Sequence, residues 1–547
     1  MDRQRVIELI GAFALGGGFV ALTYELVGVG PTAPPGSNDP AAVAENGNAS
    51  PESPGDPARG DGADADADAA ADDDSQPGAQ DDGAADGDLI IAEDNVPPYL
   101  VPDEQGQYTA YPPIVRGEPE PFDEEAEAKY PGHAIVTSLA AIVRRDADLE
   151  SPVIGVLSAG TRVRTDIERT FGGGCKPGWN RVFPRGWICR KAGLRVAETP
   201  PESSHVVSSV RAKLDQPLPY EYWRVKDEMT PFFHRLPSFE EQNAADTAGS
   251  AWYATKGRDP MPLASEGRPS EVPGVVREYM NAGYYVTKGG EEVKSKRRFL
   301  RTLRGAYARK YQLKPKDAPQ FKGRVLSGVE DLPVYFIRRA MPLMKRESEG
   351  SDVLIKTETI PERLETHGFV DSVYIGNNVY YVDGEGLLMR GYAVGKAFKL
   401  KRPPGVGETE RWLHIDLSEQ TLVAYHGDVP VFATLVSTGK EPGMTPIGVH
   451  RVQTKLVAAS MRDQPKEDAA YSIDDVPWTQ YFSGAVALHG AFWHAGFGQV
   501  RSHGCVNLSP SDARWLFGFT DPPLPTDWHA VSPTRGTPEG SAIVVTE

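Results

Sequence analysis

Near its C-terminal end the chain reads Arg501-Ser502-His503-Gly504-Cys505-Val506-Asn507-Leu508-Ser509-Pro510-Ser511-Asp512-Ala513, a stretch that includes the last of its three cysteines. A second element, Ala487-Leu488-His489-Gly490, ends shortly before it. A lone thiol with histidines nearby is the material for nucleophilic catalysis by cysteine. The stretch therefore predicts that Cys505 is a nucleophile.

The residues after Cys505 predict the start of a helix. Ser509 is a favoured N-cap, Pro510 fits the first helical position and Asp512 the third, which gives a near capping box before a helix over 513–517. The positive N-terminal end of this helix is expected to favour the thiolate of Cys505. Gly504 allows a tight turn, so the amides of 503–505 are expected to face a developing oxyanion.

Upstream of this stretch the sequence is rich in strand patterns. Residues 412–417 and 421–425 alternate apolar and polar side chains around the turn Ser418-Glu419-Gln420, which predicts a β-hairpin. Residues 429–435 and 448–455 read as further strands. The predicted fold is mostly β, with a short helix after the cysteine.

From residue 411 to about 530, this ordered set of motifs resembles the L,D-transpeptidase catalytic domain of the YkuD type. The resemblance implies a β-sandwich-like fold with the cysteine in a cleft. It also implies an enzyme that acts on peptidoglycan stem peptides in the cell envelope and is inhibited by carbapenems. The motifs that carry it are Gln420-Thr421-Leu422 with Tyr425, Ser437-Thr438-Gly439, Thr445-Pro446-Ile447-Gly448, His489-Gly490, and Ser502-His503-Gly504-Cys505-Val506-Asn507.

Two histidines are candidates for the catalytic base. His503 shares a face with Cys505 only if the segment between them is extended, whereas His489 arrives from another strand. The resemblance assigns the role of proton donor and acceptor to His489, and leaves Ser502, His503 and Gly504 to shape the pocket. Because a glycine follows His489, a backbone carbonyl would have to orient the imidazole.

Aromatic and polar residues around these histidines are candidates for substrate contact, although packing in the core is an equal interpretation for any one aromatic ring. The candidates are Tyr481, Phe492, Trp493, His494 and Asn507.

Two other functions for Cys505 are open from the residues alone. It could form a zinc site with His489, His494 and His503, but the glycines and the capped helix would then have no purpose. It could be a buried, inert thiol, but Ser502-His503-Gly504 is too polar for a core strand. No metal and no cofactor is therefore expected.

Between residues 130 and 402 a pattern recurs three times. Apolar strand runs begin at 134, 222 and 334, and each leads to an Arg-Gly pair with an aromatic residue close behind. The pairs are Arg185-Gly186, Arg304-Gly305 and Arg390-Gly391. Short strands with glycine turns predict small β-barrel units. The first unit, through 141–144, 156–163 and 178–188, resembles the bacterial Src-homology-type small barrel, which often holds an enzyme near wall polymer; a structural spacer is an equal interpretation.

Cys175 and Cys189 both lie in this first unit, on segments expected to be neighbouring strands. In an exported protein such a pair favours a disulfide over two free thiols or half of a metal site. The disulfide would leave Cys505 as the odd thiol, which fits a reactive role.

The N-terminal part predicts export. A short basic start precedes an uncharged apolar run from Leu9 to Tyr24, which fits either a membrane anchor through residues 6–29 or a cleaved signal peptide. Residues 31–98 hold seventeen Asp and Glu against one Arg, so this linker carries −16 of the net charge of −18 and the rest of the chain carries −2. No domain is basic enough to indicate binding to a nucleic acid, so no such partner is expected. The protein is expected in the periplasm, tethered to the inner membrane.

The sequence as a whole predicts a cell-envelope acyltransferase that forms 3–3 cross-links through a Cys505 thioester. The alternative is a wall-binding or spacer protein whose catalytic domain is inactive or hydrolytic. The expected segments are an anchor or signal peptide (1–30), an acidic linker (31–98), a small barrel (130–200), two β-rich units (205–320 and 328–402), a catalytic domain (408–533) and a tail (534–547).

Overall fold

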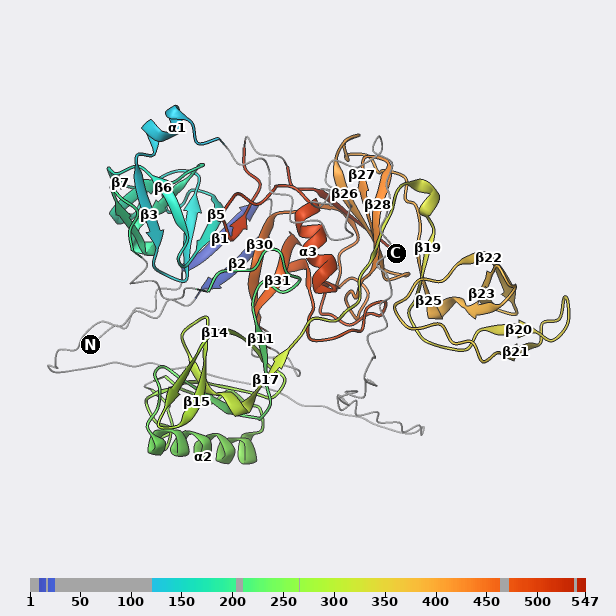
Figure 1. Cartoon of the computed structure of the whole chain (residues 1–547), viewed down its shortest axis with the longest axis horizontal. Helices are drawn as coiled ribbons and strands as arrows, with labels where there is room; N and C mark the ends of the chain where they lie inside the picture. Colours follow the sequence, from blue (N-terminus) through green and yellow to red (C-terminus); the bar gives the residue numbers. More distant parts are fainter. Residues whose placement is uncertain are drawn as a thin grey trace, which may run out of the picture. The chain divides into compact units, whose positions relative to one another are not determined.

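The computed structural model describes residues 9–15, 18–24, 121–202, 210–264, 266–462, 472–535 and 539–547, and its helices and strands are drawn in Figure 1. The architecture is mostly β with few helices, as the sequence predicts. Near the N-terminus, Leu9–Leu15 (β1) and Gly18–Tyr24 (β2) pair as a two-stranded sheet. Within the described residues, no helix has the length and apolar character needed to cross a bilayer. The predicted linker over 31–98 lies outside the described residues.

The first module comprises residues 124–197. After a short helix, Glu124–Lys129 (α1), its opening strand Gly132–Val136 (β3) pairs antiparallel with its closing strand Leu194–Ala197 (β10). The strands between them are Ala140–Arg144 (β4), Val153–Ser158 (β5), Arg162–Thr165 (β6), Thr170–Gly172 (β7), Cys175–Arg181 (β8) and Trp187–Cys189 (β9).

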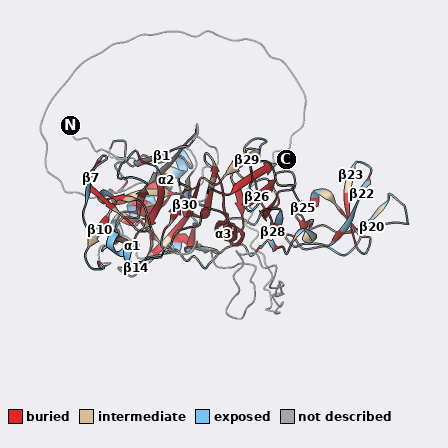
Figure 2. Cartoon of the chain, turned by 90° about the horizontal axis from the view of Figure 1, so that it is seen from above, coloured by how far each residue is buried: buried red, intermediate tan, exposed pale blue. Residues whose placement is uncertain are grey.

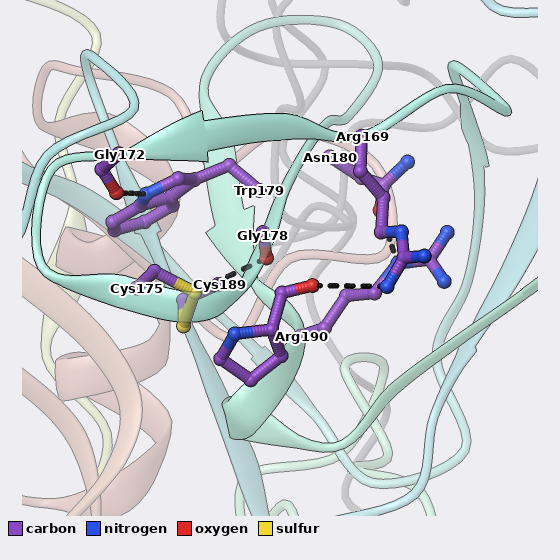
Figure 3. The surroundings of a disulfide bond; sticks show 9 residues. Arg169, Gly172, Cys175, Gly178, Trp179, Asn180, Cys189 and Arg190 are labelled. Carbon is purple, nitrogen blue, oxygen red and sulfur yellow. Dashed lines mark hydrogen bonds between the residues drawn. A yellow bond between two sulfur atoms is a disulfide. The ribbon is translucent and has the colours of Figure 1, made fainter.

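Cys175 and Cys189 form a disulfide, which confirms the pairing predicted from the sequence. They lie on the antiparallel neighbours β8 and β9, where Trp179 is opposite Cys189. The Trp179 ring packs with both cysteines, and its Nε1 donates to the carbonyl oxygen of Gly172 over 3.0 Å (Figure 3). The disulfide therefore belongs to a small buried cluster of its own.

The second module, residues 222–316, contains a helix that the sequence analysis missed, Phe239–Lys256 (α2). Ser238 and Glu241 form a capping box at its start, a signal that was readable in the sequence. Ala245 and Ala248 of this helix pack against Phe233. The strands of the module are Tyr222–Val225 (β11), Thr230–Phe233 (β12), Val276–Met280 (β13), Tyr285–Lys294 (β14), Arg297–Thr302 (β15), Tyr307–Arg309 (β16) and Leu313–Lys316 (β17).

The third module, residues 334–397, opens with Val334–Ile337 (β19) and closes with Val394–Ala397 (β25), which pair antiparallel. A five-stranded sheet lies between them in the chain. Its strands are Met344–Arg346 (β20), Leu354–Lys356 (β21), Phe369–Ile375 (β22), Asn378–Asp383 (β23) and Leu388–Arg390 (β24).

The recurrence predicted from the sequence is present in how all three modules end. Each ends with a strand, a 3-10 turn and a closing strand that pairs with the module's opening strand. The turns are Arg190–Ala192 (η2), Lys310–Gln312 (η3) and Gly391–Ala393 (η5). The prediction that Arg390-Gly391 corresponds to the first two Arg-Gly pairs is wrong. Those pairs precede a strand, whereas Arg390 ends β24 and Gly391 begins η5. The residue that corresponds to Gly186 and Gly305 is Gly386. It has a positive φ, as they do, with a value of 78°, and it precedes β24.

The C-terminal domain contains a six-stranded sheet in the order β18-β28-β27-β26-β35-β29. The predicted hairpin is present as Arg411–Asp416 (β26) and Thr421–His426 (β27), followed by Val429–Leu435 (β28). One strand comes from before the third module, since Arg324–Val325 (β18) pairs with β28. The strand predicted over 448–455 is in fact the end of one strand and the start of another, Gly448–Arg451 (β29) and Thr454–Arg462 (β30).

The predicted tail over 534–547 is wrong in its second half. Ala542–Thr546 (β35) pairs parallel with β26 and antiparallel with β29, inside the six-stranded sheet. Its residues Ala542, Ile543 and Val545 are almost fully buried. An apolar run of this kind gains stability by completing a core, so the domain extends to the end of the described chain.

A second group of paired strands carries the predicted helix. Its strands are Ala530–Val531 (β34), β30, Ser472–Ser483 (β31), Val486–Gly490 (β32) and Val506–Leu508 (β33). The helix Pro510–Phe519 (α3) is buried along its whole length, as Figure 2 shows. Its Trp515 stacks on Phe432 of β28, and its Phe517 contacts Trp478 of β31. The helix thus joins the cores of the two groups of strands.

The modules are connected to this domain by backbone and side-chain contacts. The first module contributes β5, which pairs with β34. In the second module, Arg304 forms ion pairs with Asp474 and Asp475 of β31, and the Tyr222 hydroxyl donates to the carbonyl oxygen of Asp475 over 2.5 Å.

Candidate active site

Two parallel strands bring the predicted nucleophile and base to one part of the sheet. His489 on β32 lies opposite Asn507 on β33, and Leu488 lies opposite Val506. Cys505 comes directly before β33, and the backbone of Ala487 hydrogen-bonds to its sulfur. Paired residues of parallel strands point to the same face, so His489 and Asn507 share a face. The structure therefore brings together the residues that the sequence placed in two separate motifs.

A tight turn over 502–505 presents Cys505. The Ser502 hydroxyl donates to the carbonyl oxygen of Cys505 over 2.5 Å and accepts from the Gly504 N–H over 3.1 Å. Gly504 has a φ of +132°, and a Cβ there would lie 2.7 Å from the carbonyl oxygen of Met444. Only glycine fits this position. The Gly504 amide, which was expected to face an oxyanion, is instead used within the turn.

The turn determines the direction of the His503 side chain. Because the segment is bent and not extended, His503 does not continue the face that Asn507 and His489 share, and its side chain is exposed. His489 is almost fully buried, with 2% of its surface exposed. The burial difference favours His489 as the partner of the thiol.

Residues of the Ser437-Thr438-Gly439 and Thr445 motifs support the turn from behind. The Thr445 hydroxyl donates to the carbonyl oxygen of Gly504 over 2.7 Å and accepts from the Gly439 N–H over 3.0 Å. Ser437 pairs with Asn507 through two backbone hydrogen bonds. In the sequence these motifs only carried the family resemblance. The structure shows that they hydrogen-bond to the turn and to β33.

Burial raises the pKa of the Cys505 thiol, and the hydrogen bond from Ala487 lowers it only in part. The thiol lies 3.8 Å from the carbonyl oxygen of Ala485, toward which it can donate. In the chain, β33 and Ser509 lie between Cys505 and α3, so a contribution of the helix N-terminus to the thiolate stays a prediction. The raised pKa favours the neutral thiol over the thiolate at neutral pH.

Burial also lowers the pKa of His489, to about 4, so the imidazole is neutral at pH 7. The Gly490 backbone acts on the ring and raises the pKa in part, although Nδ1 has no partner of normal hydrogen-bond geometry among the described residues. The Trp493 ring stacks on the imidazole with centroids 5.6 Å apart. A buried nitrogen without a partner is typical of a functional group that awaits a ligand or a proton.

His494 and Asn507 form a second polar pair beside His489. His494 Nδ1 accepts from the Gly496 N–H over 3.1 Å, and its Nε2 lies 2.9 Å from the Asn507 side-chain nitrogen. Burial and nearby positive groups lower the pKa of His494 to about 3, so its proton must be on Nε2. Nε2–H requires an acceptor, and the Asn507 Oδ1 has no partner as placed. Exchanging the oxygen and nitrogen of the Asn507 amide gives the Nε2–H of His494 its acceptor.

The aromatic candidates separate into two groups. Trp493 contacts His489 and is half-buried, which suits a residue that lines the site. Phe492 is fully buried between Tyr222 and Tyr285 of the second module, so it belongs to a core. Tyr481 packs in part against a small cluster that includes Val156 of the first module. For Phe492 the interpretation as core packing is correct.

Arg363 of the third module is a site residue that sequence reasoning missed. Its Nη1 donates to the carbonyl oxygen of Ala495 over 2.8 Å, and its Nη2 donates to that of Phe497 over 2.7 Å. The loop that it holds follows His494 directly. No local pattern in the sequence marks this arginine, because its partners are backbone atoms more than a hundred residues away.

In the part of the chain that the structure describes, no group of three or more His, Cys, Asp or Glu side chains is arranged to hold a metal ion.

Comparison with known families and structures identifies the C-terminal part of the chain. Residues 410–544 match the family model of the L,D-transpeptidase catalytic domain, YkuD. The match includes His489, Cys505 and most of β35. A search of curated proteins found no match.

Several solved structures are similar to part of the chain. An L,D-transpeptidase from Mycobacterium smegmatis is 20% identical over 31% of this chain and 67% of its own, with a TM-score of 0.21. The L,D-transpeptidase from Stackebrandtia nassauensis is 23% identical over 26% of this chain and 58% of its own, with a TM-score of 0.19. The L,D-transpeptidase LdtMt1 in complex with imipenem is 17% identical over 40% of this chain and 84% of its own, with a TM-score of 0.20. This chain thus matches about two thirds of the length of the M. smegmatis structure and less of the S. nassauensis structure.

Proposed function

We propose that this protein is a cell-envelope L,D-transpeptidase that acts on peptidoglycan stem tetrapeptides through a thioester on Cys505. The observation that carries the proposal is the position of Cys505, one residue before β33 and beside β32 with His489, within the residues that match the family model. A neutral thiol and a neutral, buried imidazole are the starting states for coupled nucleophilic attack and proton transfer.

In the first step, the Cys505 sulfur attacks the carbonyl carbon of the third stem residue, a diamino acid linked to a terminal D-alanine. The thiol proton passes to the imidazole of His489. The bond between the carbonyl carbon and the D-alanine nitrogen then breaks, and His489 returns the proton to the leaving amine. The products are a thioester on Cys505 and free D-alanine.

In the second step, an acceptor amine attacks the thioester carbonyl and gives up a proton to His489. The bond between carbon and sulfur breaks, and Cys505 takes the proton back as a thiol. An amine on a second stem peptide gives a 3–3 cross-link. A protein lysine gives an anchored protein, a free amino acid gives an exchanged stem, and water gives a shortened stem.

The proposal is tested with the full chain and two probes. Imipenem should add its mass to the intact protein through an acyl bond to Cys505, in line with the imipenem complex of the similar structure. Purified muropeptides incubated with the protein should give cross-linked, exchanged or shortened products, which mass analysis separates. An active thiol with no product from either probe would contradict the proposal and favour the alternative, a wall-binding or spacer protein.

The apolar run near the N-terminus is the sequence feature that suggests a place for this enzyme, whereas the structure has strands over residues 9–15 and 18–24. We propose that residues 6–29 anchor it in the inner membrane and that the acidic segment 31–98 extends into the periplasm because like charges repel one another. The modules before residue 402 then hold it near wall polymer. Cell fractionation tests the anchor, and binding of the full-length Cys505→Ala variant to insoluble peptidoglycan tests the modules.

A further inference from the structure

Two arginines contact the loop that follows His494. Arg363 holds the carbonyl oxygens of Ala495 and Phe497, as described above. Arg501 lies against Gly496, between them: a Cβ built on Gly496 would be 3.3 Å from the Nη1 of Arg501 and 3.6 Å from the Nδ1 of His494. Two guanidinium groups from distant parts of the sequence therefore flank one short loop.

Among the residues that the structure describes, no carboxylate pairs with these two guanidinium groups. Burial and Arg501 both lower the pKa of Arg363. Arg501, Arg363 and Lys316 of β17 all act to lower the pKa of His494. Within the described residues, neither Arg363 nor Arg501 forms an ion pair. Like charges held close together raise the free energy of the folded state unless an anion joins them, so this cluster is suited to an anionic ligand.

In this cluster, the guanidinium N–H groups of Arg501 are the ones available to bind a ligand. Arg363 already donates through all three of its guanidinium nitrogens, since its Nε bonds the carbonyl oxygen of Arg338. The side chain of Arg501 is exposed, and no described residue accepts a hydrogen bond from it. An arginine in this state presents a planar fork of N–H groups that matches a carboxylate.

The position of Arg501 connects this cluster to the reacting sulfur. Its backbone N–H donates to the carbonyl oxygen of Thr438 over 2.8 Å, which fixes the start of the turn that presents Cys505. His494, on the other side of the loop, bonds Asn507 of β33. A ligand held by Arg501 would therefore lie beside the turn from which Cys505 attacks.

We propose that Arg501, in the positive field of Arg363 and Lys316, binds a carboxylate of the donor stem peptide. This inference rests on the proposed function and specifies how that site selects its substrate. Two carboxylates are available near the scissile bond. One is the C-terminal carboxylate of the leaving D-alanine, and the other is the free carboxylate on the side chain of a dicarboxylic diamino acid.

The test compares three synthetic tetrapeptide donors with the full-length protein and its Arg501→Gln variant. The first donor carries both carboxylates, the second has its C-terminal D-alanine amidated, and the third has lysine in place of the dicarboxylic diamino acid. The rate of thioester formation on Cys505 is followed by intact mass. Arg298→Gln, at an exposed arginine of the second module, is the matched control.

We expect Arg501→Gln to slow acylation by the first donor about tenfold or more, because the variant loses a hydrogen bond between a charged donor and a charged acceptor. The variant should lose the preference for the donor whose carboxylate Arg501 binds, and Arg298→Gln should keep it. One donor should react at the same rate with wild type and with Arg501→Gln. The carboxylate that this donor lacks is the one that Arg501 binds. High salt should reduce the wild-type preference, since part of the cluster is exposed.

Two results would overturn the inference. If Arg501→Gln discriminates among the three donors as wild type does, no carboxylate binds there. If wild type forms no thioester with any donor while iodoacetamide, which has no carboxylate, still alkylates Cys505, the proposed function itself fails. The iodoacetamide rate in Arg501→Gln also shows whether the variant has damaged the thiol instead of the subsite.

Discussion

The two cysteine regions of this protein use the same atom in opposite ways. Cys175 and Cys189 lie on neighbouring antiparallel strands, within a cluster that includes Trp179, and they are joined (Figure 3). Cys505 stands alone at the junction of a turn and a strand, with its thiol near a backbone carbonyl. Cys175 and Cys189 are buried, whereas Cys505 is half-buried.

What distinguishes the two regions is the partner that the fold brings to each sulfur. In the first module the pairing of β8 and β9 brings a second sulfur, and the two sulfurs form a disulfide. In the C-terminal domain the pairing of β32 and β33 brings a histidine. Strand register therefore decides which partner each cysteine meets, and variants of each region test what each partner does.

Removing the unpaired sulfur should have the largest effect. We expect Cys505→Ala to abolish the mass adduct with imipenem and all thioester formation, because no other free thiol is present in the chain. Circular dichroism should show an unchanged fold. An adduct on the variant would mean that Cys505 is not the nucleophile.

Removing the partner of that sulfur should have the next largest effect. We expect His489→Gln to slow acylation by about 10²–10⁴-fold, the usual contribution of a positioned acid–base group. His503→Gln is the control and should have a much smaller effect, because His503 lies outside the shared face. Equal losses in the two variants would reopen the choice of base.

The pH dependence of alkylation tests the state of the thiol. The pKa of Cys505 is raised and that of His489 is lowered to about 4, so neither group is charged at neutral pH. The thiolate fraction then increases with pH, and the iodoacetamide rate should rise about tenfold per pH unit from pH 6 to 8. A rate that is constant from pH 5 upward would instead indicate a thiolate–imidazolium pair.

Loosening the loop beside His494 should have a smaller effect. We expect Arg363→Gln to slow acylation about tenfold, because the loop loses two hydrogen bonds from a charged donor. The iodoacetamide rate should change little, which separates positioning of the substrate from reactivity of the thiol. Arg339→Gln, at an exposed arginine of the same module, is the control. Equal acylation rates in the two variants would show that the module does not position the loop.

Removing the disulfide should have the smallest effect on chemistry. The double variant Cys175→Ser with Cys189→Ser should lose about 3 kcal/mol of stability, as expected for a loop closed over 14 residues. Denaturant unfolding measures this loss, and acylation should change by less than about twofold. A large loss of activity would mean that the two cysteine regions are coupled.

Much of the fold could be predicted from local patterns. The hairpin of β26 and β27, the strand β28, the helix α3 and the disulfide all follow from alternation, capping and cysteine placement. The helix α2 was missed although its capping box is visible in the sequence. The strand β35 was assigned to a tail because its partners, β26 and β29, are far away in the chain.

The sequence by itself predicted the chemistry of the site, because residue types and order mark Cys505, and the family resemblance carried by those motifs selects His489. Tertiary structure alone decided the charge and the surroundings of these groups. Burial raises the pKa of the Cys505 thiol and lowers that of the His489 imidazole. The contacts of Arg363 and Arg501 with one loop also depend on long-range packing, which no local pattern encodes.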